Sequence, residues 1–207
     1  MIDSDILYRL GLVSDVNGIH NVDAICFGKL AYSEQYIHSL MAHPDMTFIV
    51  ATHHGIIIGN IGFFSNTTKK SLISCLGVHP DFRKKGIANM LMSLAEASIE
   101  AKHCARCIKL QVRINNYGAI HLYEKRGYHI VKVLKKYYTT IDAYMMVKAS
   151  PTVLANYVTK RPSRCECKCT EPDCKYSAIS YRLDADKKML ICTKQQKESQ
   201  VQEAINI

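Results

Sequence analysis

The chain has 207 residues, of which 48% are hydrophobic and 22% charged, and its formal net charge is +9. These proportions support a folded core, so they exclude a fully disordered chain and a collagen-like repeat. No stretch approaches the roughly 18 consecutive apolar residues of a membrane-spanning helix, and the acidic segment 1–5 does not resemble a signal peptide. We therefore expect a soluble intracellular protein without a transmembrane segment, cytoplasmic by default, with a nuclear pool left open.

The excess of 27 Lys and Arg over 18 Asp and Glu favours anionic partners. Nucleic acid, the ribosome, an anionic membrane and a phosphorylated cofactor all satisfy this condition, and charge alone does not choose among them. The nine cysteines occur without a secretion signal, which argues against a disulfide framework. Free thiols or a metal site are the remaining uses for them.

Cysteine placement divides the chain near residue 150. Four cysteines are scattered over the first part, whereas four others lie close together between Cys165 and Cys174. The long periodic patterns also end where Ala149-Ser150-Pro151 begins. We expect one domain over residues 1–148 and a Cys-rich, basic C-terminal tail over residues 149–207.

Strand and helix patterns alternate in chain order across the first domain. Residues 7–13 can form a first strand and residues 15–27 a helix. Ser33 is a suitable N-cap for a second, short helix. The apolar face of that helix would consist of Tyr36, Ile37 and Leu40.

A β-hairpin is predicted next, because two β-rich segments flank His53-His54-Gly55. The longest helix pattern lies at 86–102, with apolar residues at three- and four-residue spacing: Ile87, Met90, Leu91, Leu94 and Ala95. The remaining predictions are strands at 47–52, 56–64, 70–79, 108–114, 128–134 and 143–147, and a helix at 118–125. The resulting order, β-α-α-β-β-β-α-β-α-β-β, indicates an α/β domain.

A basic turn joins the strand at 70–79 to the helix at 86–102. Pro80 ends the strand because it removes a ladder donor, and Arg83, Lys84 and Lys85 precede Gly86. A helix N-terminus presents backbone N–H groups and a positive dipole end, so it binds phosphate well, and Gly86 allows close approach. A solvated turn that merely caps a helix explains this motif equally well when it is taken alone.

A second motif follows the strand at 108–114. It reads Asn115-Asn116-Tyr117-Gly118-Ala119-Ile120-His121-Leu122-Tyr123, and Gly127-Tyr128 then opens a new strand. Together the two motifs resemble the GNAT superfamily of acetyl-CoA-dependent N-acetyltransferases, across residues 5–148. The resemblance implies a mixed, mostly antiparallel sheet with flanking helices, splayed at the acetyl-CoA site.

The resemblance also implies the residues that bind acetyl-CoA. The strand backbone would pair with the pantetheine arm, with the Val78 N–H stabilising an oxyanion, and Asn116 would donate a hydrogen bond to the cofactor. Tyr123 would protonate the departing thiolate. A helix N-cap is a compatible role for Asn116, and a core aromatic is the alternative for Tyr123. The full predicted set is Leu76, Gly77, Val78, Arg83, Lys84, Lys85, Gly86, Ile87, Ala88, Asn116 and Tyr123.

The end of the domain resembles the catalytic subunits of protein N-alpha-acetyltransferases, of the NatE and NatF types. The resemblance is carried by Lys135-Lys136-Tyr137-Tyr138 followed by Asp142-Ala143. It implies that the two tyrosines close over the first residues of a substrate peptide, opposite a wall of Phe27, Leu30 and Tyr32, and that Met followed by an apolar residue is preferred. Lysine or small-amine substrates remain an alternative, and hairpin-stabilising aromatics are the alternative for the tyrosines.

The general base departs from the NatE pattern, which has a tyrosine and a histidine at positions matching Leu72 and Gln111. Leucine cannot transfer a proton, although Gln111 can orient a water molecule. Glu34, acting through a water molecule, is our first choice for the base; a solvated acid at a helix start is its alternative. Deprotonation by bulk solvent, and an adaptor that binds acetyl-CoA with little turnover, stay open.

The tail contains the pattern C-x-C-x-C-x4-C, formed by Cys165, Cys167, Cys169 and Cys174. Four thiolates suit Zn²⁺, whereas acylated thiols beside basic residues would favour membrane association. Unused thiols in a flexible tail are the third interpretation. The expected partners of the whole chain are peptide or protein N-termini, the ribosome and an accessory subunit.

Overall fold

The computed structural model describes residues 5–65, 70–103, 107–149, 154, 181–184 and 189–192. These residues fall into two compact units, divided between Lys109 and Leu110. Before residue 150, and apart from short 3-10 turns, the helices and strands occur in the predicted order. None of the described helices is long and apolar enough to span a membrane.

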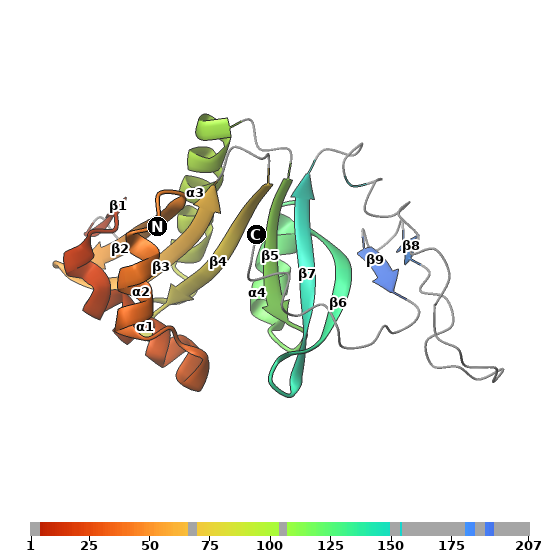
Figure 1. The fold of residues 1–207 in the computed structure, drawn as a ribbon, viewed down its shortest axis with the longest axis horizontal. Coiled ribbons are helices and arrows are strands. Elements are labelled where there is room, and N and C mark those ends of the chain that lie inside the picture. The colour runs from red at the N-terminus through yellow and green to blue at the C-terminus, as the bar shows by residue number, and fades with distance from the viewer. Residues whose placement is uncertain are drawn as a thin grey trace. The chain divides into compact units, whose positions relative to one another are not determined.

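Four antiparallel strands form the sheet of the first unit in the order β1-β2-β3-β4 (Figure 1). Their bounds are β1 Ile6–Leu10, β2 Met46–His53, β3 Ile56–Ser65 and β4 Lys70–Val78. The predicted hairpin between β2 and β3 is confirmed. His54 and Gly55 form its turn with φ angles of 49° and 80°, and two successive positive φ angles match the twist of paired strands.

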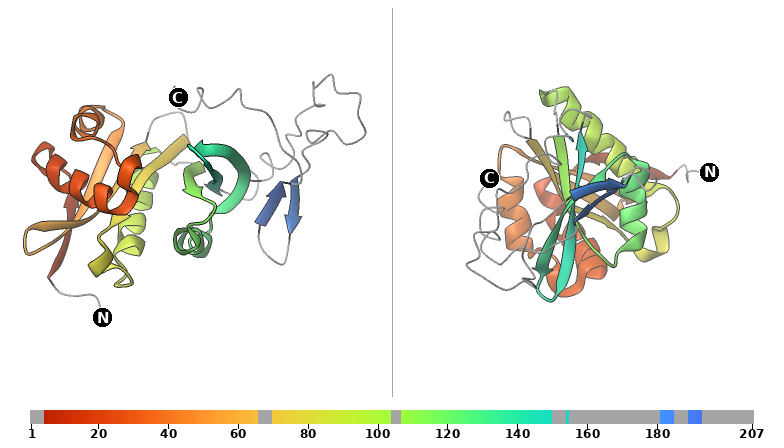
Figure 2. Two further views of the ribbon diagram at one scale, coloured as in Figure 1. Left: turned by 90° about the horizontal axis from the view of Figure 1, so that it is seen from below. Right: turned by 90° about the vertical axis from the view of Figure 1, so that its right-hand side faces the viewer.

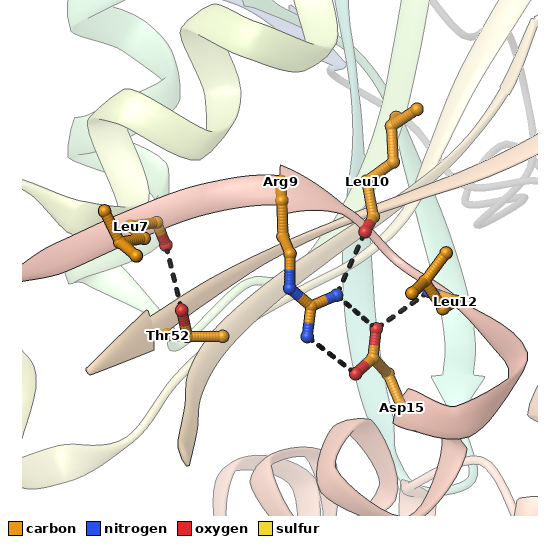
Figure 3. A network of polar contacts seen from close by, with 6 residues as sticks. All are labelled: Leu7, Arg9, Leu10, Leu12, Asp15 and Thr52. Atoms are coloured by element: carbon orange, nitrogen blue, oxygen red, sulfur yellow. Dashed lines mark hydrogen bonds and ion pairs between the residues drawn. The ribbon is translucent and has the colours of Figure 1, made fainter. Parts of the chain in front are cut away.

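Strand β1 ends earlier than predicted because side chains take over its last backbone groups (Figure 3). The Arg9 guanidinium donates to both carboxylate oxygens of Asp15, at 2.5 and 2.8 Å, and to the Leu10 carbonyl at 3.1 Å. Asp15 also accepts the Leu12 N–H at 2.8 Å. The hydrogen bonds from Arg9 are the main cause that lowers the pKa of Asp15.

Helices cover both faces of this sheet (Figures 1 and 2). The helices α1 Val16–Phe27 and α2 Glu34–Met41 lie on one face and α3 Ile87–His103 on the other. Neighbouring residues of β3 demonstrate this, since Asn60 bonds to Asp23 of α1 while a Cβ at Gly59 would touch two α3 side chains. Successive strand residues point to opposite faces, so the two contacts define the two layers.

A hydrophobic core lies between the sheet and the helices α1 and α2. Ser33 caps α2 as predicted by accepting the Tyr36 N–H at 3.2 Å. The prediction that Tyr36 lies on the apolar face is wrong, because its side chain is 47% exposed and stacks edge-on against Tyr32 instead. The buried members of this core are Ile19, Ile37, Leu40, Met46, Phe48, Val50 and Cys75.

The apolar face of α3 is rotated from its predicted position. Ile87, Leu91 and Ala95 are buried as expected. Met90 and Leu94 are only half-buried, whereas Met92 and Ile99 are fully buried. The four-residue row from Ile87 to Ile99 therefore faces the sheet, because packing selects the row that interdigitates with the strands.

The second unit contains α4 Tyr117–Lys125, β6 His129–Tyr138 and β7 Ile141–Ala149, and β5 Cys107–Arg113 enters it across the division. Strand β7 lies between β5 and β6 and pairs antiparallel with β6. Tyr123 of α4 packs against Tyr128, which follows the helix, with ring centroids 5.9 Å apart. In the tail, β8 Tyr181–Asp184 pairs antiparallel with β9 Met189–Cys192.

Candidate functional site

The end of β4 is tied to both the following turn and α1. The carbonyl oxygen of Val78 accepts a hydrogen bond from Arg83 Nε at 3.0 Å and another from the Cys26 thiol at 3.3 Å. Arg83 Nη2 also approaches Cys26 Sγ at 3.6 Å. The predicted pyrophosphate ligand Arg83 is therefore held in place by the strand, and part of its guanidinium is already engaged.

The turn after β4 has the geometry of an anion-binding helix start. Gly86 has a φ of +84°, and a Cβ there would meet nothing within 4 Å. Its carbonyl accepts the first helical hydrogen bond of α3, from Met90 N at 3.0 Å, so Gly86 stands where the first turn of the helix begins. The predicted residues Arg83, Lys84 and Lys85 are all exposed around it, whereas Ile87 is buried and Ala88 half-buried. The positive charge of this turn suits an anion such as a pyrophosphate.

A buried polar chain on the α1 face of the sheet was not predicted from the sequence. Asn60 Nδ2 donates to Asp23 Oδ1 at 2.9 Å, and the Cys75 thiol donates to Asn60 Oδ1 at 3.6 Å. Asp23 has no exposed surface. Its Oδ2 has no hydrogen-bond partner among the residues that the structure describes. The signal in the sequence was an acid four residues after Ile19, on the apolar side of a helix.

Burial is the main influence on the pKa values of Asp23 and Cys75 in this buried polar chain. It raises the pKa of Asp23 to about 6, although the hydrogen bond from Asn60 and the charge of His20 oppose the rise. The pKa of Cys75 is raised well above its usual value by burial and by the negative charge of Asp23. Near neutral pH the thiol therefore stays protonated, while the carboxyl can change its charge.

Gly77 allows β4 to pass directly beside Asp23. It pairs with Asn60 in the β3–β4 register. A Cβ at Gly77 would lie 3.1 Å from Asp23 Oδ1 and 3.4 Å from Asn60 Nδ2. Of the predicted cofactor-binding strand residues, Gly77 and Val78 are buried and Leu76 half-buried. The strand on which the acetyl group is expected thus runs against a buried carboxyl.

The residues expected to form one peptide wall lie after α1. Phe27 is half-buried at the last position of α1, and Leu30 is 38% exposed in the 3-10 turn Gly28–Leu30. Tyr32 packs against the core, and its carbonyl oxygen lies 2.8 Å from His20 Nδ1. The predicted base Glu34 is exposed at the start of α2 and accepts a hydrogen bond from Asn17 at 3.1 Å.

In the second unit, Asn116 is a helix N-cap and Tyr123 is a core aromatic, which are the structural roles considered for them above. Asn116 Oδ1 caps α4 by accepting the Ala119 N–H at 3.3 Å, which leaves its Nδ2 as a donor for a ligand. Tyr123 is only 7% exposed and stacks against Tyr128. A cap and a packed phenol are both compatible with the expected contacts to acetyl-CoA.

The tyrosine pair at the β6–β7 hairpin is rigidly supported. The Tyr137 and Tyr138 rings are nearly perpendicular, with centroids 4.9 Å apart. Tyr138 Oη donates to the backbone carbonyl of Gln111 at 3.4 Å, and the Arg113 guanidinium lies 5.3 Å from its ring centroid. Burial is the main cause that raises the pKa of Tyr138 to about 12.

The turn beyond these tyrosines is held by Asp142. Its Oδ2 lies 2.6 Å from Lys135 Nζ, and its Oδ1 accepts the Lys136 N–H at 2.9 Å. Lys136 and Thr139 have φ angles of 51° and 61°. Such angles are unfavourable for residues with a Cβ, so the Asp142 contacts explain why the chain keeps this shape.

The predicted metal ligands of the tail, Cys165, Cys167, Cys169 and Cys174, lie outside the described residues. The zinc site therefore remains a prediction.

Comparison with known proteins identifies the class of this chain. Residues 16–128 match the family described as "Acetyltransferase (GNAT) family". The chain is 39% identical over 156 residues to an N-alpha-acetyltransferase of Saccharolobus solfataricus, covering 70% of this chain and 93% of the relative. It is 29% identical to the N-terminal acetyltransferase A complex catalytic subunit NAA10 of Arabidopsis thaliana, over 68% of this chain and 76% of that protein.

Solved structures show the same fold. Ard1 from Thermoplasma volcanium matches with a TM-score of 0.64 and 24% identity, over 70% of this chain and 97% of that one. The NatC complex bound to Gag peptide and CoA contains a chain that matches with a TM-score of 0.61 and 22% identity, over 70% and 98% of the two chains.

The chain belongs to the GNAT acetyltransferase family. The predicted fold class, α/β with the GNAT arrangement of strands and flanking helices, is confirmed, as is the prediction of an acyltransferase. It is an acetyl-CoA-dependent N-acetyltransferase.

Proposed function

We propose that this enzyme acetylates the N-terminal α-amine of proteins and prefers Met followed by an apolar residue. The observation that carries the proposal is the supported pair of Tyr137 and Tyr138 at the β6–β7 hairpin. Two half-buried aromatic rings offer an apolar surface on which a large first side chain can pack. One relative named as an N-alpha-acetyltransferase and another named as a catalytic subunit of an N-terminal acetyltransferase complex support the choice of an N-terminal amine.

The chemistry of the amine is consistent with this substrate. An α-ammonium group has a pKa of about 8, whereas a lysine side chain has one of about 10.4. Near neutral pH an α-amine therefore requires less assistance to become a nucleophile. We expect the apolar residues Phe27, Leu30 and Tyr32 to form the second wall that holds the peptide.

The cofactor-binding and catalytic roles carried by the family resemblance belong to the same proposal. The backbone of Leu76, Gly77 and Val78 would hold the thioester and its pantetheine arm, with the Val78 N–H donating to the oxyanion. Tyr123 would give a proton to the departing thiolate. The pyrophosphate would bind at the exposed turn described above, with Asn116 as a further donor; the turn residues are Arg83, Lys84, Lys85, Gly86, Ile87 and Ala88.

Partners and location follow from the proposed substrate. Protein N-termini appear at the ribosome, and a net charge of +9 suits binding to its anionic surface. We propose a cytoplasmic enzyme that works with nascent chains and an accessory subunit. One relative is named as the ARD1 subunit homolog of an N-terminal acetyltransferase complex in Dictyostelium discoideum, which supports the last point.

Initial rates of CoA release test the proposed substrate. The panel contains peptides beginning Met-Leu, Met-Lys, Ser-Glu and Asp-Glu, together with an N-blocked peptide that carries a lysine. We expect the highest kcat/KM for Met-Leu. Turnover confined to the blocked peptide would contradict the proposal and favour a lysine acetyltransferase, and tight acetyl-CoA binding without turnover would favour an adaptor.

A further inference from the structure

Asp23 carries a fully buried carboxyl group, and among the residues that the structure describes only one of its oxygens has a hydrogen-bond partner. Its Oδ1 accepts the hydrogen bond from Asn60, and its Oδ2 has no partner among the described residues. Buried polar atoms are almost always satisfied, and exceptions are explained by an ordered water, a ligand or a functional role. Such an atom therefore requires an explanation.

The position of this group is as informative as its burial. Asp23 projects from α1 toward β4 at Gly77, where the missing Cβ leaves the strand backbone directly beside the carboxyl. The next residue, Val78, has its carbonyl fixed by Arg83 and Cys26. The Asp23 carboxyl group thus lies beside the same stretch of β4 that is expected to hold the reacting thioester.

We infer that Asp23 accepts the proton of the amine that attacks acetyl-CoA. This role rests on the proposed placement of the thioester along residues 76–78. The carboxylate takes one proton from the substrate ammonium, by way of a water molecule at Oδ2, and becomes neutral. Asp23 would thus supply the catalytic base that is missing here, because Leu72 and Gln111 stand at the positions of the NatE tyrosine and histidine.

The remaining steps balance without a further reagent. The neutral amine nitrogen forms a bond to the acetyl carbon, and the carbon–sulfur bond breaks. A second amine proton passes to the departing thiolate, so the products are the acetylated amine and CoA as a thiol. The proton on Asp23 then returns to solvent, which restores the carboxylate for the next turnover.

Other candidate groups fit this role less well. Glu34 is exposed and bonded to Asn17, and a solvated carboxylate is a weak base. Gln111 cannot accept a proton to any useful extent, and Leu72 has no polar atom. Asp23 is buried, which makes it the stronger base.

The neighbours of Asp23 define its expected pH range. The titratable groups that act on it are His20 on its own helix and Cys75 on β4, while β3 contributes the neutral amide of Asn60. With a pKa of about 6, the carboxyl is mostly ionised at neutral pH and ready to accept a proton. Below that value it becomes protonated, and the rate should fall.

The test compares the pH dependence of kcat/KM in the full-length wild type and in Asp23→Asn. The asparagine has the same shape and can still accept the Asn60 hydrogen bond, so we expect a folded protein with unchanged acetyl-CoA affinity. Its rate should fall by roughly 100-fold, and the acidic limb near pH 6 should disappear. Glu34→Gln is the matched comparison, which should retain that limb.

Three results would overturn the inference. The first is an Asp23→Asn rate within about threefold of the wild type, well below the gain expected from a general base. The second is a slow variant with the acidic limb unchanged, which would make Asp23 a positioning residue. The third is an acidic limb that disappears in Glu34→Gln but remains in Asp23→Asn, which would make Glu34 the base.

The inference and the proposed substrate can fail separately. If the wild type acetylates a lysine or a small amine instead of peptide N-termini, the same profiles are measured on that amine. If no amine is acetylated, ¹³C NMR of the labelled aspartate carboxyls in the acetyl-CoA complex gives the answer. A signal that titrates near pH 6 and is missing from Asp23→Asn supports the inference, and its absence contradicts it.

Discussion

Arg83 Nε donates a 3.0 Å hydrogen bond to the carbonyl oxygen of Val78, so the basic turn and the last residue of β4 form one unit. Replacing Arg83 by Ala removes this bond together with a positive charge beside the start of α3. We expect the Kd for CoA to rise by about tenfold, because a charge-assisted phosphate contact and its support are lost together. Isothermal titration with CoA and with a dephosphorylated pantetheine thioester measures the change.

Lys85→Ala is the matched control for this prediction. Lys85 Nζ lies 5.0 Å from the centroid of the Phe82 ring, in the turn rather than on β4. It should weaken CoA binding less than Arg83→Ala does, and equal effects would show that charge alone explains the role of Arg83.

Gly77→Ala tests the close approach of β4 to α1. The new methyl group would lie 3.1 Å from Asp23 Oδ1 and 3.3 Å from Val22 Cγ1, both in a packed interior. We expect a loss of about 1–3 kcal/mol in the free energy of unfolding, measured by urea denaturation. Gly118→Ala, where a Cβ meets nothing within 4 Å, should be neutral or slightly stabilising; equal stability of the two variants would contradict the described contact.

Tyr138→Phe isolates the hydroxyl group of the hairpin tyrosine. The variant keeps the aromatic ring but loses the hydrogen bond to the Gln111 carbonyl. We expect kcat/KM for a Met-Leu peptide to fall by about tenfold, equivalent to the loss of one net hydrogen bond, with no change in acetyl-CoA affinity. The exposed Tyr36→Phe variant should behave as the wild type in the same assay.

Asp23 should lower the stability of the protein at neutral pH. Its folded-state pKa of about 6 lies above the usual 3.8, so the folded state holds the proton more tightly than the unfolded chain. The stability gained from the protonated carboxyl is complete at low pH and is lost as pH rises through about 4 to 6. Asp23→Asn should therefore be more stable than the wild type above pH 7, by up to about 3 kcal/mol.

Thermal melts of both proteins from pH 4 to 8 measure this difference. A gap that widens with pH and levels off above about pH 7 is the expected result. A wild type that is the more stable of the two at pH 8 would mean that the ionised carboxyl is well satisfied, contrary to its unpaired Oδ2.

Zinc in the tail is tested by metal analysis of the full-length protein. Coordination by four clustered thiolates predicts about one zinc ion per chain. The double variant Cys167→Ser and Cys169→Ser should lose it, while Cys26→Ser in the first unit should retain it. Metal-free wild-type protein purified under reducing conditions would contradict the zinc interpretation.

Strong local signals in the sequence correctly predicted most of the elements. The β2–β3 hairpin was predicted from a turn whose residues adopt positive φ angles. The start of α2 was predicted from Ser33, which caps the helix. Both signals act within a few residues, so tertiary structure does not have to be known. The acetyl-CoA residues came from the resemblance of two motifs to the GNAT superfamily, and they stay predictions.

Features that depend on tertiary packing could not be predicted from local sequence signals. The helical pattern of α3 identified an amphipathic helix, but only contact with the sheet decided that Met92, rather than Met90, is buried. Asp23 was overlooked because an acidic residue is normally assigned to solvent. Its burial depends on Asn60 and Gly77, which are distant in the sequence and become neighbours only through the β3–β4 register.

The position of the acetyl group on a single peptide tests the central claim most directly. The peptide begins Met-Leu, has a free N-terminus and carries one internal lysine, and tandem mass spectrometry locates the modification after incubation with the enzyme and acetyl-CoA. We predict acetylation of the α-amine with the lysine unmodified. Acetylation of the lysine with a free N-terminus would contradict the assignment of this enzyme as a protein N-terminal acetyltransferase.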